Sequence, residues 1–133
     1  MTLVLDASVA VASERPNEPG HASSRALVDR VLRGDDVLVV PALFPVEVIA
    51  ALARRGHDPA AAERLVDALV APPCEVVSLG PRRAALVARF AARHRLRAAD
   101  ACYAWLAWRR GLPLVTLDEE MVRRAPGALV HLP

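Results

Sequence analysis

The sequence predicts one α/β domain over residues 1–133, built in three layers, with helices flanking a central, mostly parallel sheet of four to five strands. Short, continuously apolar runs alternate with alanine-rich segments of helical length. Runs of this kind fit strands that are buried on both faces. Alternation of strand and helix favours a parallel sheet with right-handed crossovers, and the length lies in the commonest range for a single core.

The expected strands are short apolar segments spread along the whole chain. They are Leu3–Leu5, Val37–Val40, Glu75–Val77, Leu114–Thr116 and Leu129–His131. Helices are expected in the longer segments between and beside them. They are Ala7–Ser13, His21–Arg33, Leu43–Arg54, Pro59–Val70, Pro81–Arg93, Ala98–Arg110 and Glu119–Arg124.

Proline, glycine and aspartate mark the ends of several of these helices. Prolines suit a first helical turn at three positions, Pro45, Pro59 and Pro81. Glycines follow arginine-terminated helical runs and are expected to stop them at Gly34, Gly56 and Gly111. Asp58 directly precedes Pro59, so we expect its side chain to cap that helix.

The composition combines a high hydrophobic content of 54% with only 4% aromatic residues, so the core must consist mainly of Ala, Val and Leu. No apolar run reaches the roughly 18 residues of a membrane-spanning helix, and no basic residue precedes the apolar N-terminus as it would in a signal peptide. Cys74 and Cys102 are expected to be unpaired thiols in a cytoplasmic protein. The surplus of apolar residues predicts a protein–protein contact, and we expect a homodimer.

All seventeen basic residues are arginine, which a bias in genome composition can explain without any function. The net charge of +2 excludes a protein that coats nucleic acid by bulk attraction. The arginines cluster near expected helix ends, where they are either solvated or in contact with phosphate; the candidates for phosphate contact are Arg95, Arg97 and Arg123. The four histidines are dispersed without metal-ligand spacing, which disfavours a zinc site.

Four acidic residues stand in apolar or small surroundings near strand ends and helix starts: Asp6, Glu47, Asp100 and Asp118. A carboxylate buried without a partner costs several kcal/mol or shifts its pKa until it is neutral. Ligands of open α/β sheets bind outside the carboxyl ends of the strands. Because all four residues are expected at that edge, the pattern predicts a cation between them.

Each acidic residue also has a simpler interpretation. Asp6 and Asp118 could be helix N-caps, and Asp100 could favour the helix dipole from the first turn. Glu47 is hardest to explain in this way, because apolar residues surround it on its helix. The four together favour a functional site more strongly than any of them alone. No glycine-rich phosphate loop is present, so a nucleotide cofactor is not expected.

The chain resembles the PIN-domain nucleases, and specifically the VapC-like toxins of type II toxin–antitoxin pairs. The segments that match the four acidic motifs of that family, in order, are Val4–Ser8, Pro41–Leu43 followed by Glu47, Arg97–Ala101, and Leu114–Asp118. They span essentially the whole chain. The resemblance implies a PIN-like fold and metal-dependent endonucleolytic cleavage of RNA to a 5′-phosphate and a 3′-hydroxyl. It also implies a cognate antitoxin as partner.

The resemblance further implies a role for each acidic residue. Asp6, Asp100 and Asp118 are the expected metal ligands, and Glu47 joins them directly or through a water molecule. Small hydroxyl residues accompany the site at Ser8 and Thr116. The resemblance leaves open whether Glu119, Glu120 or neither of them contributes.

The donor chemistry agrees with this picture, because oxygen ligands without Cys or His select Mg²⁺ or Mn²⁺. One or two such ions would activate water, orient the phosphodiester and neutralise developing charge. A phosphoryl-transfer α/β domain is a rival, but by resemblance it normally needs a lysine, and the chain has none. A catalytically silent PIN fold that only binds is a second rival, and loss of an acidic ligand would be its signature.

Overall fold

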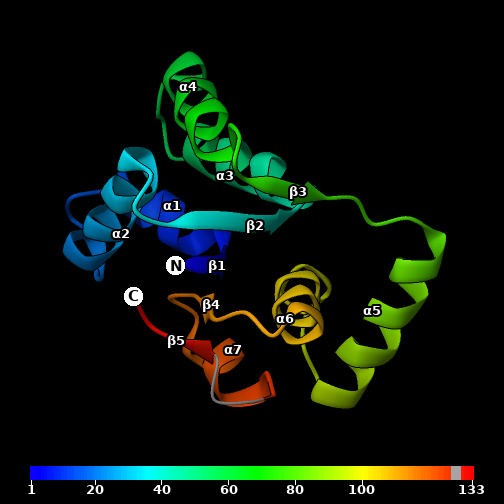
Figure 1. The fold of residues 1–133 in the computed structure, drawn as a ribbon. Helices are drawn as coiled ribbons and strands as arrows, with labels where there is room; N and C mark the ends of the chain where they lie inside the picture. The colour runs from blue at the N-terminus through cyan, green and yellow to red at the C-terminus, as the bar shows by residue number, and fades with distance from the viewer. Residues whose placement is uncertain (127–129) are drawn as a thin grey trace.

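A parallel sheet forms the centre of the molecule (Figure 1). The computed structural model describes residues 1–126 and 130–133. Within them the strands are β1 (Thr2–Leu5), β2 (Val37–Pro41), β3 (Glu75–Val77), β4 (Leu114–Val115) and β5 (Val130–His131). They form one sheet in the order β3-β2-β1-β4-β5, and every neighbouring pair is parallel. The predicted α/β class with a parallel sheet is confirmed.

Seven helices occur in the described residues, at the predicted places. They are α1 (Ala7–Ser13), α2 (His21–Arg33), α3 (Leu43–Arg54), α4 (Pro59–Val70), α5 (Pro81–His94), α6 (Ala98–Arg110) and α7 (Glu119–Arg124). Asp58 caps α4 as expected, accepting a hydrogen bond of 3.4 Å from the Ala60 amide. Gly111 ends α6 with a left-handed φ of 63°, a conformation that glycine adopts without steric cost.

The strand boundaries agree with the sequence prediction to within one residue where they can be compared. The fourth strand ends at Val115 instead of Thr116, because the chain turns there toward the start of α7. In that turn the Thr116 hydroxyl oxygen accepts a hydrogen bond of 3.0 Å from the Asp118 amide. For the last strand, predicted over Leu129–His131, residue 129 lies outside the described residues.

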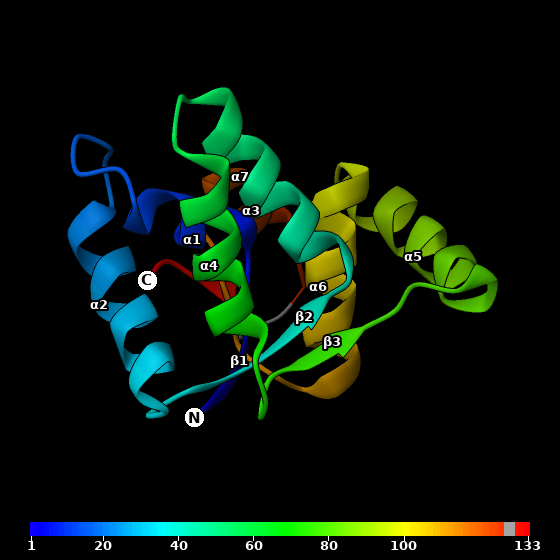
Figure 2. The same ribbon diagram turned by 90° about the horizontal axis from the view of Figure 1, so that it is seen from above.

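Helices cover the sheet on both sides (Figures 1 and 2). On one side α1 contacts α2 and α3, and α4 contacts α2 and α3. On the other side α6 packs against β1, β2 and β4, and α5 packs on the outside of α6. The three-layer arrangement that the sequence predicts is therefore present.

Between β1 and β4, the direction in which successive strands are added to the sheet changes. From β1 the chain first builds outward through β2 to β3, and then returns to add β4 and β5 on the opposite side. In sheets of this kind the carboxyl ends of the two strands beside the reversal bound a crevice. Asp6 follows β1 and Asp118 follows β4, so two of the four acidic residues flank that crevice.

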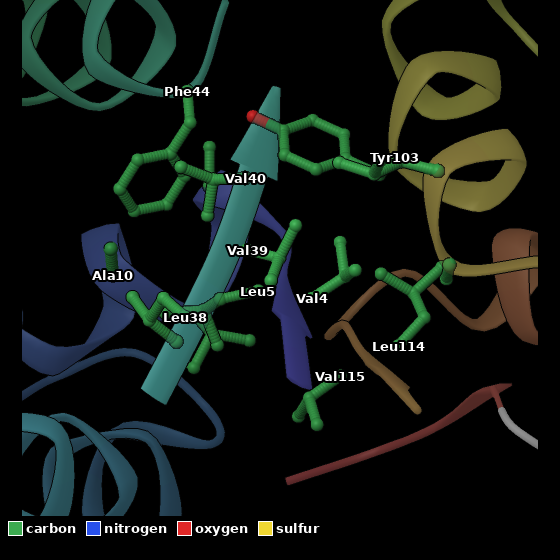
Figure 3. Close-up of a cluster of buried hydrophobic side chains, with 14 of the residues drawn as sticks. Val4, Leu5, Ala10, Leu38, Val39, Val40, Phe44, Tyr103, Leu114 and Val115 are labelled. Carbon is green, nitrogen blue, oxygen red and sulfur yellow. The ribbon is translucent and has the colours of Figure 1, made fainter. Parts of the chain in front are cut away.

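The core consists mainly of aliphatic side chains, many of them from the central strands, and includes a few large aromatic ones. Figure 3 shows part of it, with Phe44 and Tyr103 beside the strands. Leu3, Val4 and Leu5 are at most 2% exposed, and fully burying one such side chain contributes about 1.5–3 kcal/mol. Phe44 and Tyr103 are fully buried. Continuous burial along β1 explains why its sequence is apolar at successive positions instead of alternating.

None of the helices in the described part of the chain has both the length and the apolar character needed to cross a bilayer. Cys74 and Cys102 are unpaired and partly buried, as the sequence predicts. Burial is the main reason that the pKa of each thiol is raised.

Candidate active site

All four acidic residues identified in the sequence line one open cleft of about 420 Å³. Its walls come from the junction of β1 and α1, from α3, from the start of α6 and from the segment between β4 and α7. The lining residues with charged side chains are Asp6, Glu18, Glu47, Arg54, Arg55, Arg97, Asp100 and Asp118. The cleft therefore lies at the carboxyl edge of the sheet, where the strand order places it.

Asp6 stands at the N-cap position of α1, but its side chain makes no capping hydrogen bond. Its Oδ2 instead accepts hydrogen bonds from the Ser8 hydroxyl at 2.5 Å and the Thr116 hydroxyl at 2.7 Å. The residue is only 6% exposed. Burial raises the pKa of Asp6, and the two hydroxyl bonds offset part of that rise. Capping does not explain this carboxylate.

Ser8 and Thr116, the two predicted supporting hydroxyl residues, connect the segments that carry Asp6 and Asp118. The Ser8 Oγ accepts a hydrogen bond of 3.1 Å from the Leu117 amide. The Thr116 Oγ1 accepts one of 3.0 Å from the Asp118 amide. Because each hydroxyl also donates to Asp6, the end of β1 and the end of β4 are held in one hydrogen-bond network.

Asp118 has two functions within the described structure. Its Oδ1 caps α7, accepting from the amides of Glu120 at 2.9 Å and Met121 at 3.3 Å. Its Oδ2 accepts a hydrogen bond of 2.9 Å from an Nη of Arg97. The capping interpretation is thus correct for one oxygen of Asp118 and leaves the other for the cleft.

Asp100 lies in the first turn of α6 and is joined to Asp118 through the same arginine. The Arg97 Nε donates to the Asp100 Oδ2 at 3.1 Å. The pKa of Asp100 is raised mainly by burial, with smaller contributions from the charges of Asp118 and Asp6, while Arg97 lowers it. Burial outweighs the arginine here, because the Arg97 side chain is 74% exposed and largely solvated.

Glu47 enters the cleft from α3 and has a buried partner on the opposite side of the sheet. The Tyr103 hydroxyl, from α6, donates a hydrogen bond of 2.7 Å to the Glu47 Oε1. Burial raises the pKa of Glu47, the tyrosine lowers it, and the charges of Asp6 and Asp100 raise it further. Figure 3 shows the Tyr103 ring extending from α6, with its oxygen at the far end.

The chemistry of the cleft suits a hard divalent cation. Three of its four central carboxyls have raised pKa values, mainly because they are buried and to a smaller extent because of neighbouring like charges. The four candidate metal ligands offer oxygen atoms, which Mg²⁺ and Mn²⁺ prefer. In the described residues no three acidic, histidine or cysteine side chains already stand in metal-binding geometry. Arg97 supplies the positive charge between Asp100 and Asp118 in this arrangement.

Comparison with known proteins agrees with the geometry. The family model of the PIN domain matches residues 3–126. The chain belongs to the PIN domain family. Among solved structures, PAE2754 from Pyrobaculum aerophilum is 28% identical, with a TM-score of 0.67, over 98% of this chain and 83% of that one. VapBC2 from Rickettsia felis, bound to a DNA fragment from its promoter, has the same fold at 12% identity, with a TM-score of 0.67, over 99% of this chain and 98% of that one. No curated protein matches.

The arginines proposed from the sequence lie at different places in this PIN domain. Arg97 lines the cleft and bridges two of its acids. Arg95 ends α5 with an exposed side chain and a left-handed φ of 55°, and its carbonyl accepts a hydrogen bond of 2.8 Å from Arg124. Arg123 is exposed on α7. Neither Arg95 nor Arg123 lines the cleft.

The acidic residues after Asp118 do not line the cleft of this PIN domain either. Glu119 is exposed. Glu120 forms an ion pair of 2.7 Å with Arg124, one helical turn further along α7. Of the alternatives that the sequence left open, the structure therefore favours the one in which neither glutamate joins the site.

Sequence analysis did not identify several residues that line the cleft of this PIN domain or contact its acidic side chains. Tyr103 follows Asp100 by three positions, a spacing that places two side chains on the same face of a helix, so helical periodicity could have indicated it. Arg54 and Arg55 lie at the end of α3, and Arg55 pairs with Glu18 at 3.6 Å. That pair joins segments far apart in the sequence, and no local pattern indicates it.

Proposed function

We propose that the chain is a Mg²⁺- or Mn²⁺-dependent endoribonuclease that hydrolyses RNA phosphodiester bonds. One observation carries the proposal: four carboxyl groups from four separate segments line a single open cleft at the carboxyl edge of the sheet. Membership of the PIN domain family supports nuclease chemistry in general.

Asp6, Asp100 and Asp118 would hold the ion, and Glu47 would join them directly or through water. When bound, the ion supplies activation of water and neutralises the charge that develops on the phosphate. Ser8 and Thr116 fix the Asp6 carboxylate through the hydrogen bonds described above. The Asp118 cap on α7 fixes that carboxylate relative to the end of β4. Orientation of this kind avoids reorganisation during the reaction.

Arginines would bind the phosphates that flank the cleavage site. Arg54 lines the cleft and is exposed, and a guanidinium can hold a phosphate through two parallel hydrogen bonds. Arg95, Arg97 and Arg123 remain candidates for the same role. The products would be a 5′-phosphate and a 3′-hydroxyl, because water and not the 2′-hydroxyl of the RNA attacks.

A second candidate function is a PIN fold that binds without cleaving. The ion pairs of Arg97 favour this second function, because the arginine already neutralises Asp100 and Asp118 in the described structure. All four acidic residues are nevertheless present, whereas a silent module would be expected to have lost at least one of them.

An assay with purified protein and a panel of structured RNAs separates the two candidates. With added Mn²⁺ or Mg²⁺ the nuclease should cleave at least one RNA, and excess EDTA should stop the reaction. The ends of the fragments, tested by a 5′-phosphate-dependent exonuclease, should be sensitive to it. Binding of RNA without cleavage at any metal concentration would instead support the silent module.

We further propose that the chain acts in the cytoplasm as the toxin of a toxin–antitoxin pair, with an antitoxin protein that covers the cleft. An open, acid-lined groove is complementary to an arginine-bearing segment of a partner. The shared fold with VapBC2 supports this setting. Expression of the chain alone should then slow bacterial growth, and unimpaired growth would count against the toxin role.

A further inference from the structure

Arg97 forms two ion pairs at the centre of the cleft. Its Nε lies 3.1 Å from the Asp100 Oδ2, and one Nη lies 2.9 Å from the Asp118 Oδ2. One guanidinium therefore joins the start of α6 to the start of α7, across a separation of 21 residues in the sequence. Its side chain is 74% exposed, so solvent reaches it while it makes both contacts.

We propose that Arg97 is an internal counter-cation that competes with the divalent metal for Asp100 and Asp118. The proposal rests on the metal-dependent function above and adds a second occupant for the same carboxylates. In the metal-free protein Arg97 would hold the two acids together. Metal binding would then require the guanidinium to leave them.

The atoms involved make the competition direct. The Asp118 Oδ1 already accepts hydrogen bonds from the backbone amides of α7, so the oxygen of Asp118 that is more available to an ion in the cleft is Oδ2, the atom that Arg97 contacts. At Asp100 the guanidinium also contacts Oδ2. An arginine and a metal ion cannot both occupy the direct line to the same carboxylate oxygen.

The pairing is also weak enough to be displaced. The Arg97 side chain is 74% exposed, so solvent and salt screen its ion pairs, and holding the long side chain in place costs entropy. A divalent ion with several carboxylate ligands carries twice the charge and needs no long side chain to be ordered. After displacement, the guanidinium would stand at the wall of the cleft, free to contact a phosphate of the substrate.

Removal of the Arg97 side chain should leave α6 intact. Arg97 occupies the N-cap position with extended backbone angles, and its side chain makes no capping hydrogen bond. The backbone carbonyl, which any residue retains, accepts the hydrogen bond of 2.9 Å from the Ala101 amide. A change in metal affinity in a variant at this position would therefore reflect the lost guanidinium and not a lost helix.

The test is calorimetric titration of Mn²⁺ into the metal-free protein without RNA, for the wild type, Arg97→Gln, Arg97→Lys and Arg54→Gln. Arg54 lines the same cleft and makes no ion pair with the described residues, so Arg54→Gln measures the effect of losing a nearby positive charge. We expect Arg97→Gln to bind Mn²⁺ roughly three- to tenfold more tightly than the wild type, in line with the loss of two ion pairs made by a largely exposed arginine. Arg54→Gln should change the affinity much less.

Arg97→Lys should fall between the wild type and Arg97→Gln, because a lysine keeps the charge but cannot bridge both acids through a fork of donors. Circular dichroism would establish that all variants are folded, and Mn²⁺ should raise the melting temperature of Arg97→Gln more than that of the wild type. If all the proteins bind Mn²⁺ with equal affinity, the role of Arg97 is overturned while the metal site stands. If none of them binds Mn²⁺, the proposed metal site itself falls.

Discussion

Asp6 and Asp118 both occupy the N-cap position of a helix, yet their carboxylates have different partners. Asp118 uses one oxygen for the amides of α7, whereas the Asp6 Oδ2 accepts hydrogen bonds from the hydroxyl groups of Ser8 and Thr116. The difference has an energetic meaning. Capping hydrogen bonds stabilise a charged carboxylate, whereas burial favours the neutral form. A cation bound beside a buried carboxylate would restore its charged form.

At the scale of single residues, Tyr103 is expected to position Glu47. Tyr103→Phe removes the hydroxyl that donates to the half-buried glutamate and should destabilise the protein by about 1–2 kcal/mol. RNA cleavage should slow by roughly tenfold, as is typical when a partner of a metal-site residue is lost. Because the tyrosine lowers the pKa of Glu47, the acidic limb of the pH–rate profile should move to higher pH.

Urea unfolding and the pH dependence of cleavage measure both effects. In a Glu47→Gln background the change at Tyr103 should have little further effect on the rate, because the two residues act through one hydrogen bond. A Tyr103→Phe enzyme with an unchanged pH profile would show that the tyrosine is only a packing residue.

The residues of the site were predictable only where the signal is local. The four acids follow or precede recognisable strands and helices, so their common edge follows from the α/β pattern. Arg97 was noticed as part of a basic cluster, but its position between Asp100 and Asp118 was not foreseen. Its second partner is 21 residues away, and such a contact depends on how α6 and α7 meet in space.

At the scale of elements, the helices were predictable because each begins or ends with a distinctive residue. Proline starts α4 and α5, and glycine ends α2 and α6. Strand ends were less certain, since the apolar run continues past the last paired residue. The end of β4 at Val115 depends on the hydroxyl network of Thr116, which only the folded structure assembles.

In the connection between α1 and α2, Gly20 lies against Leu117, which lines the cleft. Gly20, before α2, has a φ of 81°, and a Cβ there would lie 2.6 Å from the Leu117 Cδ2. Gly34 has a similar φ of 83° with nothing within 4 Å. Gly34→Ala should therefore cost about 1–2 kcal/mol from backbone strain alone. Gly20→Ala should cost roughly 0.5–1 kcal/mol more, because Leu117 must leave its preferred rotamer.

Chemical denaturation of both variants gives the comparison. In a Leu117→Ala background the extra cost at Gly20 should disappear, since the side chain in its way is gone. Equal losses for the two glycine variants in the wild-type background would contradict the close contact.

At the scale of the whole molecule, the metal-free protein should be strained by its own acidic residues. The pKa values of Asp6, Glu47 and Asp100 are raised in the folded state. A group of this kind adds stability below its unfolded pKa, near 4, and that stability is lost as the pH rises through the folded pKa. The wild type should therefore lose stability relative to Asp6→Asn as the pH rises from about 4 through the raised value.

Thermal unfolding from acidic to neutral pH, without metal, tests this pH dependence. Groups that the two proteins share, such as the exposed Glu75–Arg110 pair, cancel in the difference. An excess of Mn²⁺ about a hundredfold over Kd should stabilise the wild type by roughly 2.7 kcal/mol and Asp6→Asn by much less. A stability difference that stays constant with pH would contradict the assigned strain.

The exposed apolar surface bears on assembly. Val46, Leu86 and Trp108 are each more than 40% exposed, and the composition leads us to expect a homodimer that would cover apolar surface of this kind. Light scattering at micromolar concentration should give twice the monomer mass of 14.3 kDa. A mass of one chain would reject the dimer.

The central claim is that the cleft acids form a metal-dependent nuclease site, and Asp100 tests it most directly. Asp100 occupies the first turn of α6, where a neutral asparagine could replace it without loss of the fold. The measurement is the rate of RNA cleavage by Asp100→Asn with Mn²⁺, beside the wild type and with circular dichroism as the check on folding. The account predicts that the folded variant does not cleave RNA that the wild type cleaves. Cleavage at the wild-type rate by Asp100→Asn would contradict it.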